Sequence, residues 1–231
     1  MKRFKSVLML ILAVIPAIYT AIAVLFIMPD TVAAHFGING TPDRYGSKYE
    51  AFILPAIILG IYIVYFLIRK FALRSSADEN SRVEANISVI DTVITVVLIL
   101  FNVMNVFILI VMSKPEIMKN KENMIFVIIS SVIGLLFIIL GNIMPKTKPN
   151  SMVGMRLSFC MDSDEHWHIA NRAGGIAMVL SGLATIISGL IVRNGTYIIW
   201  MLISLVVFLT VAIIYSYVKI KGEKNPHRSN H

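Results

Sequence analysis

Four polar side chains recur at helical intervals within one apolar stretch of the chain. Asp91, Thr95, Asn102 and Asn105 are separated by 4, 7 and 3 residues, so a helix would place them along one face. A carboxylate beside carboxamides could guide a cation or a proton, and an ionisable group at membrane depth is a functional candidate by default. The alternative is packing through interhelical hydrogen bonds, each worth about 0.6 kcal/mol. We favour packing, because the sequence offers Asp91 no second membrane-embedded charge as a partner.

A cluster of metal-ligand residue types lies further along the chain, between residues 162 and 168. It contains Asp162, Asp164, Glu165, His166 and His168. His166 and His168 are two residues apart and would face different sides of a helix. The carboxylates are better explained by helix capping, with Asp162 as the N-cap and Glu165 three residues later. We therefore expect a helix to start here and no metal to bind.

Nothing else in the sequence indicates catalysis or a cofactor. The chain contains no nucleophile elbow, no zinc-protease helix motif and no phosphate-binding loop. Its single cysteine, Cys160, excludes an internal disulfide and a Cys-rich metal site. We expect a protein that is not an enzyme and that uses no metal or cofactor.

The elements that carry these residues are suited to a lipid bilayer. Of the 231 residues, 57% are hydrophobic and 15% are charged, whereas a soluble domain carries about 25% charged residues to face water. This composition excludes a disordered chain, a disulfide scaffold and a soluble nucleic-acid-binding domain. The net charge of +8 fits cationic helix flanks that face anionic lipid, so we expect no direct contact with nucleic acid.

Six apolar segments are long enough to cross the bilayer, which takes about 20 residues each. They cover Val7–Met28, Ala51–Ile68, Ile87–Met112, Met124–Met144, Gly174–Val192 and Tyr197–Val218. The first segment is longer than the apolar core of a signal peptide, so we expect it to be retained as a span. The sequence thus predicts an all-α, multi-pass membrane bundle of six helices.

Lys and Arg are distributed unequally between the two sides of the predicted membrane. The side with both termini carries fifteen of these cations and the other side carries six, so the positive-inside rule places both termini in the cytoplasm. Residues 29–50 then form an outer loop and residues 145–173 an inner loop. We divide the chain into a two-helix unit, residues 1–70, and a four-helix unit, residues 71–231.

Two local patterns refine this division. Ser76 with Glu79 three residues later predicts a capped start for the third helix. In the fifth span, the small residues Ala177, Ser181 and Thr185 are four apart and predict a close packing face. That face could lie inside a monomer or between the copies of a homo-oligomer.

Part of the inner loop resembles the signature of a known family. The run Gly141-Asn142-Ile143-Met144-Pro145-Lys146-Thr147-Lys148-Pro149-Asn150 is followed by Gly154-Met155-Arg156 and then by Trp167 and Asn171-Arg172. This pattern resembles the SdpI family, bacterial membrane proteins named for immunity to a sporulation-delaying toxin peptide. Members commonly follow the arginine with a Pro-Trp-Thr-Leu-like run, whereas this chain has Ser158-Phe159-Cys160-Met161. If that run contacts a partner, the partner differs here.

The outer loop resembles the domain of unknown function that often precedes this signature. The residues that carry the resemblance are Pro29, His35, Gly40, Pro42-Asp43 and Gly46-Ser47-Lys48. The glycines and the proline predict turns. His35 has no second His or Cys nearby to complete a metal site, so we interpret His35, Gly40 and Asp43 as parts of an ordered surface loop.

The resemblance implies immunity to a peptide toxin in a bacterial cell membrane, together with recruitment of a soluble repressor inside the cell. We expect the functional strip to consist of Asn142, Pro145, Lys146, Lys148, Asn150, Gly154, Arg156, Trp167, Asn171 and Arg172. The lysines and Arg156 would contact an acidic partner or lipid headgroups, while Asn150 and Gly154 would shape the strip. Trp167 would anchor at the membrane interface.

Two other functions stay open. One is a small transporter or ion-conducting protein that uses Asp91 and the face of Asn102 and Asn105. The other is a membrane scaffold whose inner loop binds a regulator without any outer ligand. Loss of function in Asp91→Asn would favour the first, and tolerance of a replaced outer loop would favour the second.

Overall fold

The computed structural model describes residues 2–75, 80–114, 123–149 and 154–224. Six long helices run through it: α1 (Lys2–Phe26), α2 (Ile53–Ser75), α3 (Asn80–Ser113), α4 (Asn123–Ile143), α5 (Asp164–Val192) and α6 (Tyr197–Lys224). Each contains a stretch long and apolar enough to cross a membrane, which confirms the six expected spans. The cap predicted at Ser76 lies outside the described residues. Helix α5 begins ahead of its predicted span, and this early start decides the structure of the inner loop.

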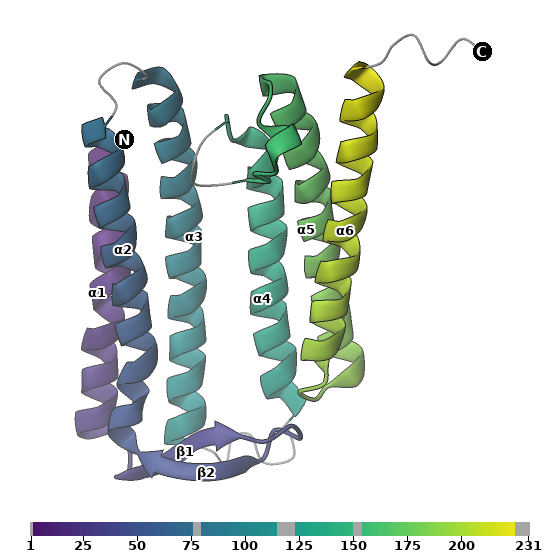
Figure 1. Cartoon of the computed structure of the whole chain (residues 1–231). Helices are drawn as coiled ribbons and strands as arrows, with labels where there is room; N and C mark the ends of the chain where they lie inside the picture. Colours follow the sequence, from purple (N-terminus) through teal and green to yellow (C-terminus); the bar gives the residue numbers. More distant parts are fainter. Residues whose placement is uncertain (1, 76–79, 115–122, 150–153, 225–231) are drawn as a thin grey trace.

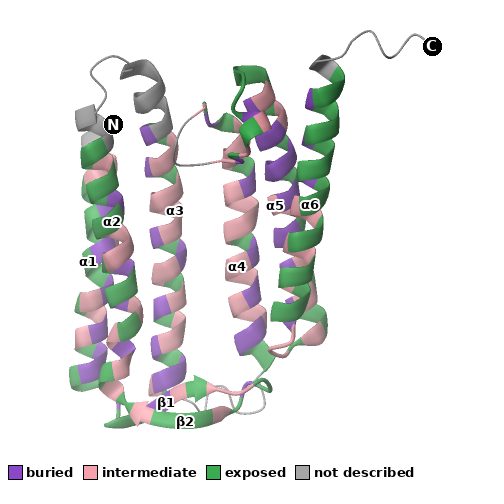
Figure 2. Ribbon diagram, in the orientation of Figure 1, coloured by how far each residue is buried: buried purple, intermediate pink, exposed green. Residues whose placement is uncertain are grey.

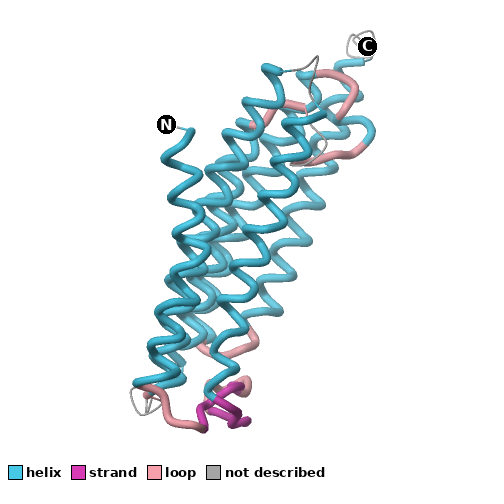
Figure 3. The backbone as a smooth tube through the Cα atoms, turned by 90° about the vertical axis from the view of Figure 1, so that its left-hand side faces the viewer, coloured by secondary structure: helices cyan, strands magenta, loops and turns pink. Residues whose placement is uncertain are grey.

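The helices stand side by side, with α1, α2 and α3 in one half of the bundle and α4, α5 and α6 in the other (Figure 1). Helix α3 packs against α1 and α2, and α5 packs against both α4 and α6. The two chain ends lie at one end of the bundle and the two strands at the opposite end, as the side view in Figure 3 also shows. An even number of spans places both ends of the chain at the same end of the bundle.

The outer loop folds as a β-hairpin, so the all-α prediction was wrong for this segment. Strands β1 (Thr31–Phe36) and β2 (Pro42–Ser47) pair antiparallel, and the 3-10 turn η1 (Lys48–Phe52) leads from them into α2. Val32 in β1 is buried against the bundle, where a β-branched side chain packs well. The turn between the strands contains Gly40 at φ 81°, a conformation that glycine adopts without steric cost.

Two ion pairs brace the base of the hairpin. Arg44 Nη2 lies 2.7 Å from Glu50 Oε2, and Lys48 Nζ lies 2.8 Å from Asp30 Oδ1. The hydrogen bond and the charge of Lys48 lower the pKa of Asp30 below its ordinary value. Both pairs are solvent-exposed on at least one side, so they define the hairpin geometry more than they add stability.

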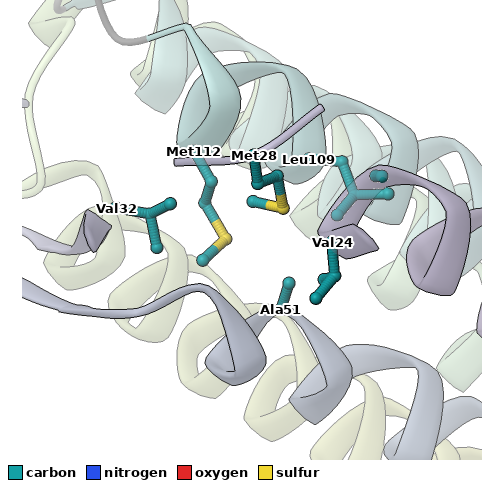
Figure 4. Packing of buried hydrophobic residues seen from close by; sticks show 7 residues of the cluster. Val24, Met28, Val32, Ala51, Leu109 and Met112 are labelled. Atoms are coloured by element: carbon teal, nitrogen blue, oxygen red, sulfur yellow. The ribbon is translucent and has the colours of Figure 1, made fainter. Parts of the chain in front are cut away.

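The hairpin rests on an apolar cluster at the ends of the first three helices. Side chains from α1, β1, the η1 turn and α3 meet there, as Figure 4 shows for Val24, Met28, Val32, Ala51, Leu109 and Met112. All six are buried. The cluster joins the strands to the helices, so the hairpin is part of the packed structure.

The outward faces of the helices remain exposed in the isolated chain (Figure 2). These faces carry mainly Ile, Leu, Val and Phe side chains. Helix α6 is the most exposed of the six, because 11% of the residues in its most apolar stretch are buried. Because water would not solvate such faces, lipid chains must cover them.

Helices α4 and α5 approach each other through paired glycines. A Cβ atom on Gly134 would lie 2.5 Å from the carbonyl oxygen of Gly182, and one on Gly141 would lie 2.5 Å from that of Gly175. Glycines at seven-residue intervals thus bring the two backbones into contact, as small residues do in membrane bundles. The face predicted for the fifth span, Ala177, Ser181 and Thr185, is also buried inside the monomer, and Ser181 Oγ lies 3.5 Å from the carbonyl oxygen of Ser204 in α6.

We expect Gly134→Leu to lower the free energy of unfolding by about 1–3 kcal/mol, because the added side chain would push α4 away from α5. The matched control is Gly60→Leu in α2, where a Cβ would meet no atom within 4 Å. Thermal unfolding of the purified protein in detergent measures the difference. Equal melting temperatures for the two variants would contradict the close approach of α4 and α5.

Candidate functional site

Trp167 lies beneath the inner loop, so the predicted role as an anchor at the membrane interface is wrong. Its side chain is 1% exposed, and its indole Nε1 donates a hydrogen bond to the carbonyl oxygen of Thr147 at 2.9 Å. Thr147 is also buried. The physical reason is that α5 starts at Asp164, which places Trp167 in the first helical turn, where the loop folds back over it. Trp167 therefore holds the segment that follows α4 against α5.

Asn171 holds the other half of the same loop. Its Oδ1 accepts a hydrogen bond from the backbone N–H of Met155 at 2.8 Å, and its Nδ2 donates to the carbonyl oxygen of Trp167 at 3.0 Å. Gly154 precedes Met155 with φ 120°, and a Cβ atom there would lie 2.5 Å from Asn171 Oδ1. Only glycine fits this position, so Gly154, Trp167 and Asn171 together hold the loop against α5 at Thr147 and Met155.

The cations of the predicted strip lie on the surface above these anchors. Lys146, Lys148, Arg156 and Arg172 are exposed, and so is Asn142. Asn150 lies outside the described residues. The strip therefore divides into buried residues that fix the backbone and exposed residues that can meet a partner.

The run that departs from the family pattern forms a short 3-10 turn, η4 (Ser158–Cys160). Cys160 is fully buried, and burial raises the pKa of its thiol. The Phe159 ring packs edge-on against Tyr217 of α6, with ring centroids 5.4 Å apart. In this chain the run thus attaches the inner loop to α6.

Helix α5 is capped by Ser163, so the cap predicted at Asp162 was misplaced by one residue. The Ser163 side chain accepts a hydrogen bond from the backbone N–H of His166 at 3.1 Å. Asp164 and Glu165 then lie in the first turn, where the helix dipole favours negative charge. Ser and Asp are equally good N-caps, so residue type alone does not decide between positions 162 and 163. Among the residues that the structure describes, no group of three His, Cys, Asp or Glu could hold a metal.

A groove of about 560 Å³ runs beside the α4–α5 contact at this end of the bundle. Asn142 at the end of α4 and Pro145 in the 3-10 turn η3 (Met144–Lys146) form one wall. His168 and Arg172 of α5 form the other. The structure therefore brings Asn142, Pro145 and Arg172 of the predicted strip to one concave site.

Asp91 has a charged partner, so the statement that the sequence offers it none was wrong. Arg69 near the end of α2 places its Nε 3.5 Å from Asp91 Oδ1, and the Tyr65 hydroxyl donates a hydrogen bond to the same oxygen. Asp91 is 5% exposed. Tyr65 and Arg69 lie four residues apart on one face of α2, so a single helical turn supplies both partners.

The two asparagines of the same row hydrogen-bond to α1. Asn102 Nδ2 donates to the carbonyl oxygen of Leu12 at 2.9 Å. Asn105 Nδ2 donates to Tyr19 Oη and to Thr20 Oγ1, both at 3.1 Å. These bonds cross between α1 and α3, as the packing interpretation requires.

The outer-loop residues singled out in the sequence lie together in the hairpin. His35 Nδ1 and Asp43 Oδ1 are 2.5 Å apart across the strands, and both side chains are exposed. Gly40 occupies the turn beyond them. Next to it, the carbonyl oxygen of Ile38 accepts a hydrogen bond from the backbone N–H of Gly195 at 2.8 Å. Gly195 belongs to the α5–α6 turn, so the hairpin tip reaches the second half of the bundle.

Sequence reasoning missed the partners of these residues. Thr147 and Met155 act through backbone groups, which leave no signal in side-chain type. Arg69 and Tyr65 did carry a signal, because a tyrosine and an arginine one helical turn apart at the end of an apolar span can reach a carboxylate on the next helix.

Two family models match parts of the chain. The domain of unknown function DUF1648 matches residues 11–59, and the SdpI/YfhL protein family matches residues 146–218. An uncharacterized protein of Archaeoglobus fulgidus is 57% identical over 30 residues, which are 13% of this chain and 16% of that protein. The similarity thus spans about one sixth of the relative's length. No solved structure matches the chain at a significant level.

Cys160 provides a native probe of the inner loop, since it is the single cysteine of the chain. We expect Asn171→Ala to raise the rate of Cys160 alkylation about tenfold to a hundredfold, because it leaves the Met155 N–H without its buried acceptor. The matched control is Asn142→Ala, which removes an exposed carboxamide bonded within its own helix to Ile138 O. Equal alkylation rates would contradict the anchoring role of Asn171.

We expect Asp91→Asn to lower the free energy of unfolding by about 1–3 kcal/mol, because it leaves the charge of Arg69 without its partner. The loss is smaller than for a fully buried ion pair, because Arg69 is partly exposed to solvent. The Arg69 side chain is 25% exposed. The double variant Arg69→Gln/Asp91→Asn should regain part of the loss, because no uncompensated charge remains. Thermal unfolding measures all three proteins. An Asp91→Asn protein with unchanged stability but lost function would instead favour the transporter interpretation.

Proposed function

This membrane protein carries an SdpI/YfhL family domain after a DUF1648 domain, and from that premise we propose that it gives immunity to a peptide toxin and relays the toxin's presence to a soluble regulator. We place it in a bacterial cell membrane with both termini in the cytoplasm. The bias of fifteen cations to six supports this orientation. The archaeal relative makes an archaeal membrane the alternative. The protein acts by binding and not by catalysis.

The observation that carries the proposal is the display of cations beside the two anchored points of the inner loop, Thr147 and Met155. Lys146 and Arg156 are exposed, while the backbone beside them is held by the buried side chains of Trp167 and Asn171. A segment that is already held in place loses little conformational freedom on binding, so more of the contact energy is available for affinity. The positive charges of Lys146 and Arg156 favour an acidic partner.

The outer hairpin supports the toxin-facing half of the proposal. Strands β1 and β2 form a sheet of two strands, so each strand has an outer edge that an extended peptide could pair with. Ile38 and Tyr45 are exposed on the hairpin and could contact the apolar residues of such a peptide.

Helix α5 physically joins the two proposed binding regions. At one end of it, Gly195 in the following turn hydrogen-bonds to Ile38 of the hairpin. At the other end, Trp167 and Asn171 hold the inner loop. A bound peptide that moved α5, together with the α4 helix packed against it, would therefore also move the inner loop at the opposite end of the bundle.

Survival of a toxin-sensitive bacterium tests the proposal. We expect wild-type protein to protect cells against a sporulation-delaying-type peptide, and Arg156→Ala to reduce protection at least tenfold. Arg156→Lys retains the charge and loses the planar guanidinium, so partial protection would indicate a charge role and no protection a bidentate one. Lys221→Ala is the control, because it removes an exposed cation of α6 outside the strip.

Membrane insertion of each variant is verified by its recovery in the membrane fraction, and the fold of its inner loop by the alkylation rate of Cys160 in detergent. Absence of protection by a correctly inserted wild-type protein would contradict the immunity function. Protection that survives replacement of residues 31–47 by a flexible linker would contradict the role of the hairpin and favour the scaffold interpretation.

A further inference from the structure

A second groove, of about 520 Å³, lies between α5 and α6. Its floor is made of the small side chains Ala173, Ala177 and Ala212, which are all buried. Larger apolar side chains, including Leu180 and Phe208, form its walls. The groove exists because alanines take the positions where larger residues would fill the gap between the helices.

The groove has a charged end and an apolar end. His168 and Arg172 of α5 and Lys219 of α6 line one end, which is the end of the bundle that carries the chain termini. Leu180 and Phe208 line the opposite end, deeper in the predicted span. The polarity therefore changes along the groove in the same direction as in one leaflet of a bilayer.

We propose that this groove binds one anionic phospholipid, with an acyl chain over the alanine floor and the phosphate between Arg172 and Lys219. Both cations are exposed, so they are accessible to a headgroup. The outer faces of α5 and α6 carry exposed apolar side chains such as Ile176 and Val211, which places the groove against the lipid phase.

The dimensions favour a lipid chain over a peptide helix. The lining residues of α5 extend from His168 to Leu180, which is a rise of about 18 Å along a helix. A volume of about 520 Å³ over this length gives a mean cross-section of about 30 Å², whereas a helix about 10 Å wide needs about 80 Å². The groove is therefore wide enough for a hydrocarbon chain and too narrow to enclose a helix.

A second copy of the protein is also a poor occupant. Two copies in one membrane have the same orientation, so a symmetric contact through this face would bring the cationic ends of both grooves together. Arg172 and Lys219 of each copy would then repel those of the other. An anionic headgroup removes this conflict, because it supplies the opposite charge.

Native mass spectrometry of the full chain in detergent tests the proposal with phosphatidylglycerol and phosphatidylcholine of identical acyl chains. We expect phosphatidylglycerol to bind more tightly, and Lys219→Gln to weaken it about fivefold, the contribution of one juxtamembrane cation. Arg172→Gln/Lys219→Gln should abolish the preference for the anionic lipid. Lys221→Gln is the matched control, because it removes a cation of the same helix end that does not line the groove.

Val211→Trp tests the acyl-chain part independently of charge. Val211 is an exposed wall residue, so its replacement should block the groove without disturbing the core, and both lipids should bind less tightly. Thermal unfolding verifies that each variant is folded. Lys219 does not line the α4–α5 groove, so failure of this proposal is distinguishable from failure of the proposed immunity function.

Several outcomes of these experiments would overturn the inference. They are equal binding of the two lipids, equal effects of Lys219→Gln and Lys221→Gln, unchanged lipid binding by Val211→Trp, and a dimer that excludes lipid from the groove. Competition with phosphatidylglycerol provides a further test. If inorganic phosphate competes as effectively as a short-chain phosphatidylglycerol, the inference is also overturned, because the headgroup alone would then account for binding.

Discussion

The contact between α4 and α5 positions the residues that line the groove beside it, because the two helices meet through backbone atoms and not through long side chains. Gly134 and Gly141 of α4 face Gly182 and Gly175 of α5. In a bilayer, lipid chains are as apolar as leucine, so association depends on close packing of this kind. A contact made by backbones leaves little freedom for one helix to shift against the other. The inner loop is built on this fixed pair.

The inner loop owes its shape to polar groups that are buried and satisfied. The Trp167 indole and the Asn171 carboxamide each bind a backbone group of the loop, and an unmet backbone donor in that position would be costly. Such bonds specify one path of the chain. The same arrangement leaves the lysines and arginines of the loop outside, so a basic surface results without any buried charge.

The first half of the bundle is held together by different means. Polar side chains within the spans join α3 to α1 and α2, through Asn102, Asn105 and the Asp91–Arg69 pair. The hairpin then covers one end of these helices with an apolar cluster. Its tip hydrogen-bonds to the turn between α5 and α6, which ties the two halves together at the end opposite the inner loop. The structure thus connects both surfaces through α5.

Much of the architecture follows from local chemistry that a sequence displays directly. The number of spans, the packing face on α5 and a helix start near residue 163 could all be predicted, because length, small-residue spacing and capping preferences act over a few neighbouring residues. The outer loop was predicted only as an ordered loop with turns, and its two strands were missed, because strand pairing joins residues up to sixteen positions apart.

Tertiary structure decided the roles of individual side chains. Trp167 is a buried anchor and not an interfacial one, because the loop that covers it returns from twenty residues earlier in the chain. Asp91 is paired, because α2 presents Arg69 and Tyr65 across a helix contact. In both cases the residue type determined which interactions the side chain can make. The partner was set by packing between distant segments, which composition and periodicity do not encode.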